Sequence, residues 1–167
     1  MSMSNIRPMA QTSDAGASVV RPERTLVGTW RLLSWEARAS DGTVSYPFGE
    51  QSVGYCVYTV DGHVFGQLMR PGRPSFEGGD ILGGTAEENA LALQGYIAYG
   101  STYEIEDGTV VHYVEMSLFP NWIGGEQRRN IDWDADRLIL TTPPIMTGGG
   151  VLVHRLTWER VLPRGGA

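Results

Sequence analysis

Lysine is absent from the sequence, and all 13 basic residues of the 167-residue chain are arginine. Without lysine the chain cannot form a Schiff base with a substrate or attach pyridoxal phosphate covalently. It also cannot supply the lysine that binds the nucleotide phosphates in a P-loop. These enzyme classes are therefore excluded, and we expect no cofactor.

Cysteine and histidine are scarce. The single cysteine, Cys56, excludes a disulfide within the chain, so a reducing compartment is favoured and we expect a cytoplasmic location. Cys56 lies in a strand pattern and is expected to be a small core residue. His63, His112 and His154 show no close spacing on one strand or helix and have no cysteine partners, so we predict no metal site.

Long apolar runs and clusters of positive charge are also missing. No stretch approaches the roughly 20 apolar residues that span a bilayer, and residues 1–24 lack the apolar core of a signal peptide. The net charge is −6 and the arginines are scattered, whereas a nucleic-acid-binding face needs clustered positive charge. We expect neither a membrane nor a nucleic acid as partner; the oligomeric state stays open.

The length fits one domain. Residues 1–24 are small and polar and cannot bury enough apolar area to order themselves, which predicts a flexible N-terminal tail. An alternative is a flap over the mouth of a cavity. We predict a barrel domain over residues 25–162 and a C-terminal tail over residues 163–167.

Short strands separated by turn residues fill the predicted domain. Asp-Gly pairs at Asp41, Asp61 and Asp107 are typical of type I′ hairpins, and a fourth turn is expected at Asp134-Ala135. Eight or nine hairpin-connected strands with no second helical layer are best buried by closing the sheet on itself. We therefore predict an all-β fold, a closed antiparallel barrel whose strands lie near residues 29–40, 43–46, 53–60, 63–70, 99–106, 109–118, 126–133, 137–142 and 151–161.

One short helix is expected between the middle strands. Thr85 and Glu88 have the spacing of a capping box, and apolar residues recur at helical spacing up to Ile97. The irregular segment 70–84 before it is too long for a simple connection. Loop and helix are expected either to cap one end of the barrel or to act as structural filler.

Several segments resemble a known family. They are Gly28-Thr29-Trp30 and residues 45–49, 69–74, 117–122 and 154–160. Together they resemble the microbial lipocalin-like domain family from about Leu26 to Val161. The resemblance implies a cavity for a hydrophobic small molecule, with Trp30 closing the barrel floor and Arg160 packed across it. It also implies that some relatives in natural-product pathways are cofactor-independent cyclases or isomerases.

The Asp107-Gly108 turn gives the clearest prediction of an inner face. Counting outward from it pairs Tyr103 with His112, on the more apolar face of the hairpin. A neutral imidazole beside a phenol in a dry pocket is able to relay protons, although a structural core hydrogen bond is the alternative. Apolar alternation on the last strand places His154 on the same face as Trp158, either as a ligand contact or as an ordinary core histidine.

The candidate catalytic residues are thus Tyr103, His112 and His154. The candidate ligand-binding residues share an expected position on the inner face or at the mouth: Tyr58, Phe65, Gln67, Tyr99, Val114, Met116, Trp122 and Trp158. Two further positions stay open. Glu36 is a carboxylate near the mouth or a surface residue, and Arg129 is a buried anion contact unless the register is shifted by one.

These features predict a barrel that binds one small, hydrophobic, partly oxygenated molecule of polyketide or terpenoid type. The sharper hypothesis is a cofactor-free cyclisation or isomerisation in secondary metabolism, in which the cavity holds a reactive conformer while polar groups move a proton. The first alternative is a non-catalytic binding or carrier protein. The second is an interaction domain whose barrel is filled with side chains.

Overall fold

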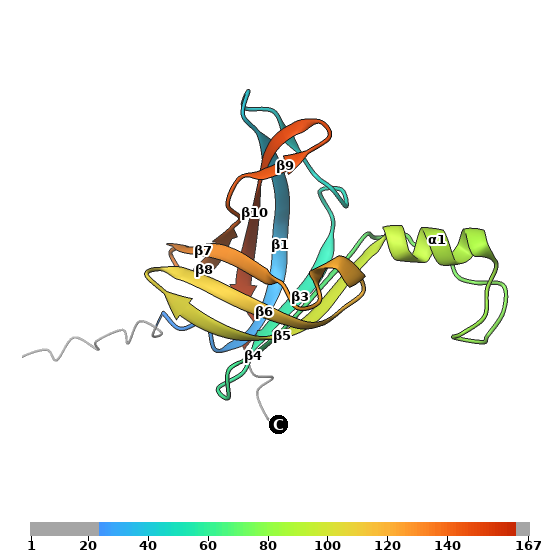
Figure 1. Cartoon of the computed structure of the whole chain (residues 1–167), viewed down its shortest axis with the longest axis horizontal. Helices are drawn as coiled ribbons and strands as arrows, with labels where there is room; N and C mark the ends of the chain where they lie inside the picture. Colours follow the sequence, from blue (N-terminus) through green and yellow to red (C-terminus); the bar gives the residue numbers. More distant parts are fainter. Residues whose placement is uncertain (1–23, 163–167) are drawn as a thin grey trace, which may run out of the picture.

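A computed structural model describes residues 24–162, and the predicted tails lie outside the described residues except for Arg24. Eight antiparallel strands form the barrel (Figure 1). They are β1 (Gly28–Ala39), β3 (Val53–Tyr58), β4 (His63–Met69), β5 (Tyr96–Glu106), β6 (Thr109–Ser117), β7 (Glu126–Asp134), β8 (Arg137–Thr141) and β10 (Gly150–Arg160). The pairing of β1 with β10 closes the sheet, so the predicted closed antiparallel barrel is confirmed.

Two short strands lie outside the closed ring. Strand β2 (Val44–Ser45) pairs with the end of β1, and β9 (Ile145–Thr147) pairs with the start of β10. Together these four segments form a ribbon that rises from the barrel in Figure 1. The sequence did not predict β9.

The barrel floor is built as the family resemblance implied. The Arg160 guanidinium lies 4.2 Å from the centre of the Trp30 ring, and it donates to the carbonyl oxygens of Val27 and Thr25 at 2.8 and 2.6 Å. Gly28 has φ +137°, and a Cβ there would lie 2.4 Å from Arg160 Nη1. The glycine is therefore required both by its backbone conformation and by the space that the arginine occupies.

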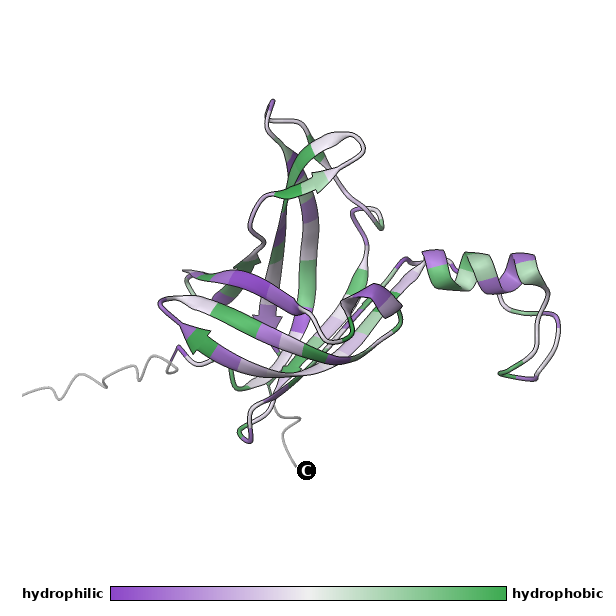
Figure 2. Cartoon of the chain, in the orientation of Figure 1, coloured by the Kyte–Doolittle hydropathy of each residue, from purple (hydrophilic) through white to green (hydrophobic). Residues whose placement is uncertain are grey.

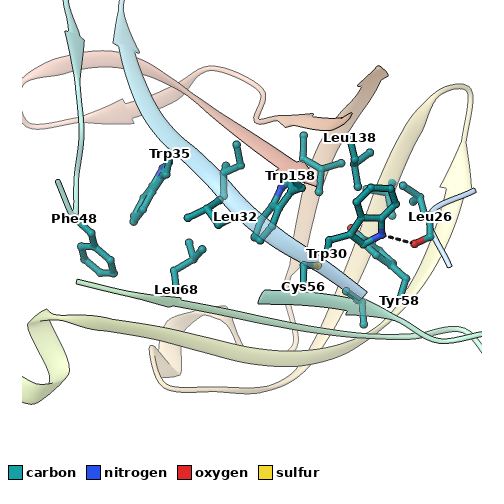
Figure 3. Close-up of a cluster of buried hydrophobic side chains, with 14 residues drawn as sticks. Leu26, Trp30, Leu32, Trp35, Phe48, Cys56, Tyr58, Leu68, Leu138 and Trp158 are labelled. Carbon is teal, nitrogen blue, oxygen red and sulfur yellow. Dashed lines mark hydrogen bonds between the residues drawn. The ribbon is translucent and has the colours of Figure 1, made fainter. Parts of the chain in front are cut away.

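Buried side chains extend from this floor along the barrel axis. Figure 3 shows Trp30, whose indole N–H donates to the Leu26 carbonyl at 2.7 Å, at one end of the cluster and Trp35 with Phe48 at the other. Trp30 packs edge-on against Trp133 of β7. Hydropathy alternates along the strands, as Figure 2 shows, because successive side chains face the interior and the solvent.

Two β-bulges change which side chains face inward. In β1 the register shifts between Leu32 and Ser34, so Trp35 is buried and Glu36 turns away from the interior to pair with Arg38. In the β5–β6 pair the register shifts between Gly100 and Ser101. Each bulge adds one residue to one strand and reverses the alternation beyond it.

The helix α1 (Ala86–Gln94) begins at the predicted capping box of Thr85 and Glu88. None of its nine residues is buried, and it projects away from the barrel in Figure 1. The expectation that loop and helix cap one end of the barrel is therefore wrong. The 3₁₀ turn η1 (Pro120–Trp122) joins β6 to β7. Among the described residues no helix is long and apolar enough to cross a membrane.

Candidate functional site

The barrel encloses a cavity of about 650 Å³ above its floor. Its wall is mainly apolar, with indole rings from Trp35, Trp122 and Trp158 and aliphatic side chains such as Leu140 and Leu156. Polar side chains reach the wall from different strands, among them Tyr99 on β5, His112 on β6, Arg129 on β7 and His154 on β10. An interior filled with side chains, one of the predicted alternatives, is excluded by this volume.

His112 is held between two tyrosines. Its Nε2 lies 2.8 Å from the Tyr58 hydroxyl and its Nδ1 lies 2.9 Å from the Tyr99 hydroxyl. A neutral imidazole has one donor and one acceptor nitrogen, so one tyrosine donates to the ring and the other accepts from it. Tyr58 is fully buried, whereas Tyr99 lines the cavity. The three side chains therefore form a hydrogen-bonded chain from the core to the cavity wall.

The charge states in this chain are set by burial. Desolvation, with a smaller contribution from the Arg129 charge, lowers the pKa of His112 to about 3. Desolvation also raises the pKa values of both Tyr58 and Tyr99 above the ordinary phenol value. All three side chains are neutral near pH 7. A proton that moves along this hydrogen-bonded series is therefore passed from one neutral side chain to the next.

His154 has a single defined tautomer. The indole N–H of Trp35 donates to its Nδ1 at 3.0 Å, and an indole can only donate. The proton of neutral His154 is therefore on Nε2, which makes that atom a hydrogen-bond donor. Burial and the Arg129 charge lower the pKa of His154, so it is neutral at physiological pH.

Arg129 faces the interior, which settles the register left open by the sequence. It pairs with fully buried Val110 of β6, and it shares its face of β7 with half-buried Gln127 and Ile131. Its guanidinium hydrogen bonds go to the Arg128 carbonyl at 2.7 Å and the Gln127 side-chain oxygen at 3.2 Å.

Tyr103 does not join the group around His112. The two residues are Cα partners, as predicted, but the Tyr103 hydroxyl donates to the Thr59 carbonyl at 3.1 Å. Its ring packs edge-on against Tyr58, with 5.0 Å between ring centres. The phenols that His112 contacts are Tyr58 and Tyr99.

Two of the predicted ligand contacts are placed elsewhere by the structure. Phe65 is exposed on the outer face, because Val64 and not Phe65 pairs with Tyr58. Met116 is 64% exposed, because the bulge in the β5–β6 pair reverses the alternation before it. Gln67, by contrast, lines the cavity at its exposed edge, where its side-chain oxygen accepts from the Tyr96 hydroxyl at 3.0 Å.

The other predicted contacts lie in or beside the cavity. Tyr99, Trp122 and Trp158 line it, and the rings of Tyr99 and Trp122 meet edge-on with 5.7 Å between their centres. Val114 and Tyr58 are buried behind the wall. The indole N–H of Trp158 is buried and has no hydrogen-bond partner among the described residues.

The sequence did not identify several wall residues, among them Trp35 and Cys56. Trp35 follows a bulge that alternation cannot reveal, and Cys56 was expected only as a core residue. Cys56 is buried and also lines the cavity, and desolvation raises the pKa of its thiol to about 12. The thiol is therefore protonated and a poor nucleophile.

Within residues 24–162 no group of three or more histidine, cysteine, aspartate or glutamate side chains could hold a metal ion.

A closed barrel with an apolar cavity and a few polar wall groups defines the class of small-molecule-binding barrels. The chain belongs to the lipocalin-like domain family, whose pattern matches residues 27–161. A relative from Aspergillus oryzae, the 4'-hydroxy-3'-methoxypropiophenone carrier protein ppsC, is 42% identical over 107 residues, which cover 59% of this chain and 96% of the relative.

Solved structures also resemble the chain. A lipocalin-like protein from Bacteroides uniformis has a TM-score of 0.43 at 11% identity, covering 81% of this chain and 98% of that one. An uncharacterized protein from Bacteroides eggerthii has a TM-score of 0.41 at 13% identity, covering 82% and 100%. These values are too low to bear on function.

Proposed function

We propose that the protein binds and carries one small, apolar, partly oxygenated molecule in its barrel. The observation that supports this most strongly is the cavity itself, whose volume of about 650 Å³ falls in the range of ligand sites, roughly 300 to 1,000 Å³. The relative of 42% identity is named as a carrier of a hydroxylated, methoxylated aryl ketone. An aryl ketone of that kind matches a wall of aromatic rings with a few hydrogen-bonding groups.

The polar groups fit the oxygen atoms of such a ligand. His154 Nε2 is a donor suited to a carbonyl or methoxy oxygen, since its tautomer is fixed by Trp35. Tyr99 can donate to or accept from a ligand oxygen while His112 takes the complementary role. Trp122 and Trp158 supply flat surfaces against which an aromatic ring can pack.

Calorimetric titration with 4'-hydroxy-3'-methoxypropiophenone tests this function. We expect the titration to give one molecule bound per barrel. In thermal unfolding we expect a Tm that rises with ligand concentration, because a ligand bound only to the folded state stabilises it. Leu156→Trp, which adds a large side chain to the cavity wall, should weaken binding. Leu91→Trp is the control, since Leu91 is exposed on α1. Failure of this ketone and of a panel of apolar probes to bind would reject the proposal.

A second candidate function is cofactor-free isomerisation or cyclisation, and the chain from Tyr58 through His112 to Tyr99 favours it. Tyr99 would give its proton to a ligand carbonyl oxygen, His112 would reprotonate Tyr99, and Tyr58 would reprotonate His112. The α-proton of the ligand would pass to the Tyr99 oxygen and protons would move back through His112 to Tyr58, so the enolisation leaves all three side chains in their starting state and needs no oxidant or reductant.

Exchange of the α-protons of a bound aryl ketone with D₂O, followed by NMR, separates the two functions. A catalyst accelerates the exchange, and His112→Gln abolishes the acceleration. His63→Gln, which alters an exposed turn, leaves it intact. A carrier binds the ketone without accelerating exchange above the buffer rate.

A further inference from the structure

The cavity contains a positive charge that no carboxylate of the described residues neutralises. Glu126 is the one acidic residue that residues 24–162 contribute to the wall, and its carboxylate oxygen lies 2.9 Å from Nε of Arg128. Arg128 also contacts Glu106 at 3.2 Å. Within residues 24–162, by contrast, Arg129 forms no ion pair, and its hydrogen bonds go to the neutral oxygens of Arg128 and Gln127.

The Arg129 charge reaches groups on several strands. It lowers the pKa values of His112 on β6 and His154 on β10, and it opposes the upward shift in the pKa values of Cys56 on β3 and Tyr99 on β5. In each case the guanidinium favours the more negative state of its neighbour. The same field acts on any acidic group that enters the cavity.

An unpaired charge in an apolar cavity is costly, and an anion of the ligand removes that cost. We propose that the cavity selects molecules carrying an acidic hydroxyl conjugated with a carbonyl group and binds them as their oxygen anions, paired with Arg129. This inference rests on the proposed function and adds the charge state of the ligand.

The protein groups around Arg129 do not titrate near neutral pH. The pKa values of His112 and His154 are lowered, and those of Cys56, Tyr58 and Tyr99 are raised. Glu126 and Arg128 neutralise each other at the edge. Between about pH 6.5 and pH 9 the ligand hydroxyl is therefore the group that changes charge.

The pair of probes is 4-hydroxyacetophenone and its methyl ether, 4-methoxyacetophenone, which share a shape but differ in the ionisable hydroxyl. The phenolate absorbs at longer wavelength than the phenol, so absorbance gives the pKa of the bound probe. We expect that pKa to lie at least one unit below the value in free solution, which corresponds to phenolate binding at least tenfold tighter than phenol. Arg129→Gln should remove this shift. Arg137→Gln, which removes an exposed arginine of β8 outside the cavity, should preserve it.

Each outcome decides between the two proposals. If the ether binds and the pKa of the bound phenol is unchanged or raised, the anion proposal is wrong and the proposed function stands. If neither probe binds, both are wrong. If Arg129→Gln fails to fold, the wild-type pKa shift still decides, because the titration needs no variant.

Discussion

The Tyr99 hydroxyl lies 2.9 Å from Nδ1 of His112, at the boundary between the cavity and the buried core. Behind His112 the Tyr58 hydroxyl completes the chain at 2.8 Å. A Cβ at Gly66 of β4 would lie 2.9 Å from the Tyr99 ring, so this glycine makes room for the tyrosine. The position of Tyr99 is thus determined by both neighbouring strands.

Replacing Tyr99 with phenylalanine should weaken ligand binding about fivefold. The change keeps the ring but removes a hydroxyl whose hydrogen bond contributes on the order of 1 kcal/mol. Calorimetric titration measures the loss. Tyr55→Phe is the matched control, because Tyr55 is exposed on β3 and does not line the cavity. Equal affinities for the two variants would contradict the placement of Tyr99 at the ligand.

The free energy of unfolding should fall as the pH decreases from about 6.5 towards 3. His112 is neutral in the folded barrel with its pKa lowered to about 3, whereas in the unfolded chain its pKa returns to about 6.5. The unfolded state therefore binds the proton first. One such group gives a slope of about 1.4 kcal/mol per pH unit between the two pKa values.

Urea denaturation at several pH values measures this slope, and His112→Gln should reduce it by about one proton. His154 contributes in the same direction, because its pKa is also lowered. His63→Gln is the comparison that removes a histidine outside the barrel interior, since the His63 side chain is 43% exposed. An unaltered slope in His112→Gln would show that His112 is not buried as a neutral group.

Replacing Gly28 with alanine should destabilise the barrel by about 2 kcal/mol. The new Cβ would collide with Nη1 of Arg160, and the φ of +137° is unfavourable for any residue with a side chain. The Arg160 guanidinium would then leave the Trp30 ring and the carbonyls of Val27 and Thr25. Gly78→Ala serves as the comparison, because no atom lies within 4 Å of a Cβ at that position. Urea denaturation of both variants provides the test.

The sequence predicts register best where the turn chemistry is strict. At Asp107-Gly108 both residues have positive φ, as a two-residue type I′ turn requires, and the predicted pairing of Tyr103 with His112 is confirmed. At the Asp61-Gly62 pair only the glycine has positive φ, and the hairpin loop is longer. The pairing predicted for Tyr58 and Phe65 was consequently off by one residue, which moved Phe65 to the outer face.

Bulges account for the other differences at the site. The extra residues Leu33 and Glu115 interrupt the alternation of β1 and β6, and no residue type in either strand signals them. A prediction from side-chain alternation alone therefore placed Met116 inside the barrel and did not identify Trp35 as a wall residue. Hydrogen-bond partners also depend on the three-dimensional closure of the barrel. The contacts of His112 with Tyr58 and of His154 with Trp35 join residues 54 and 119 positions apart.

Native mass spectrometry of the purified protein, followed by denaturing extraction of any bound molecule, tests the central claim most directly. We expect one small organic molecule per barrel, either carried through purification or acquired on adding 4'-hydroxy-3'-methoxypropiophenone, and we expect Leu156→Trp to lose it. A protein that stays free of ligand after incubation with this ketone and with a panel of apolar aromatic probes would contradict it.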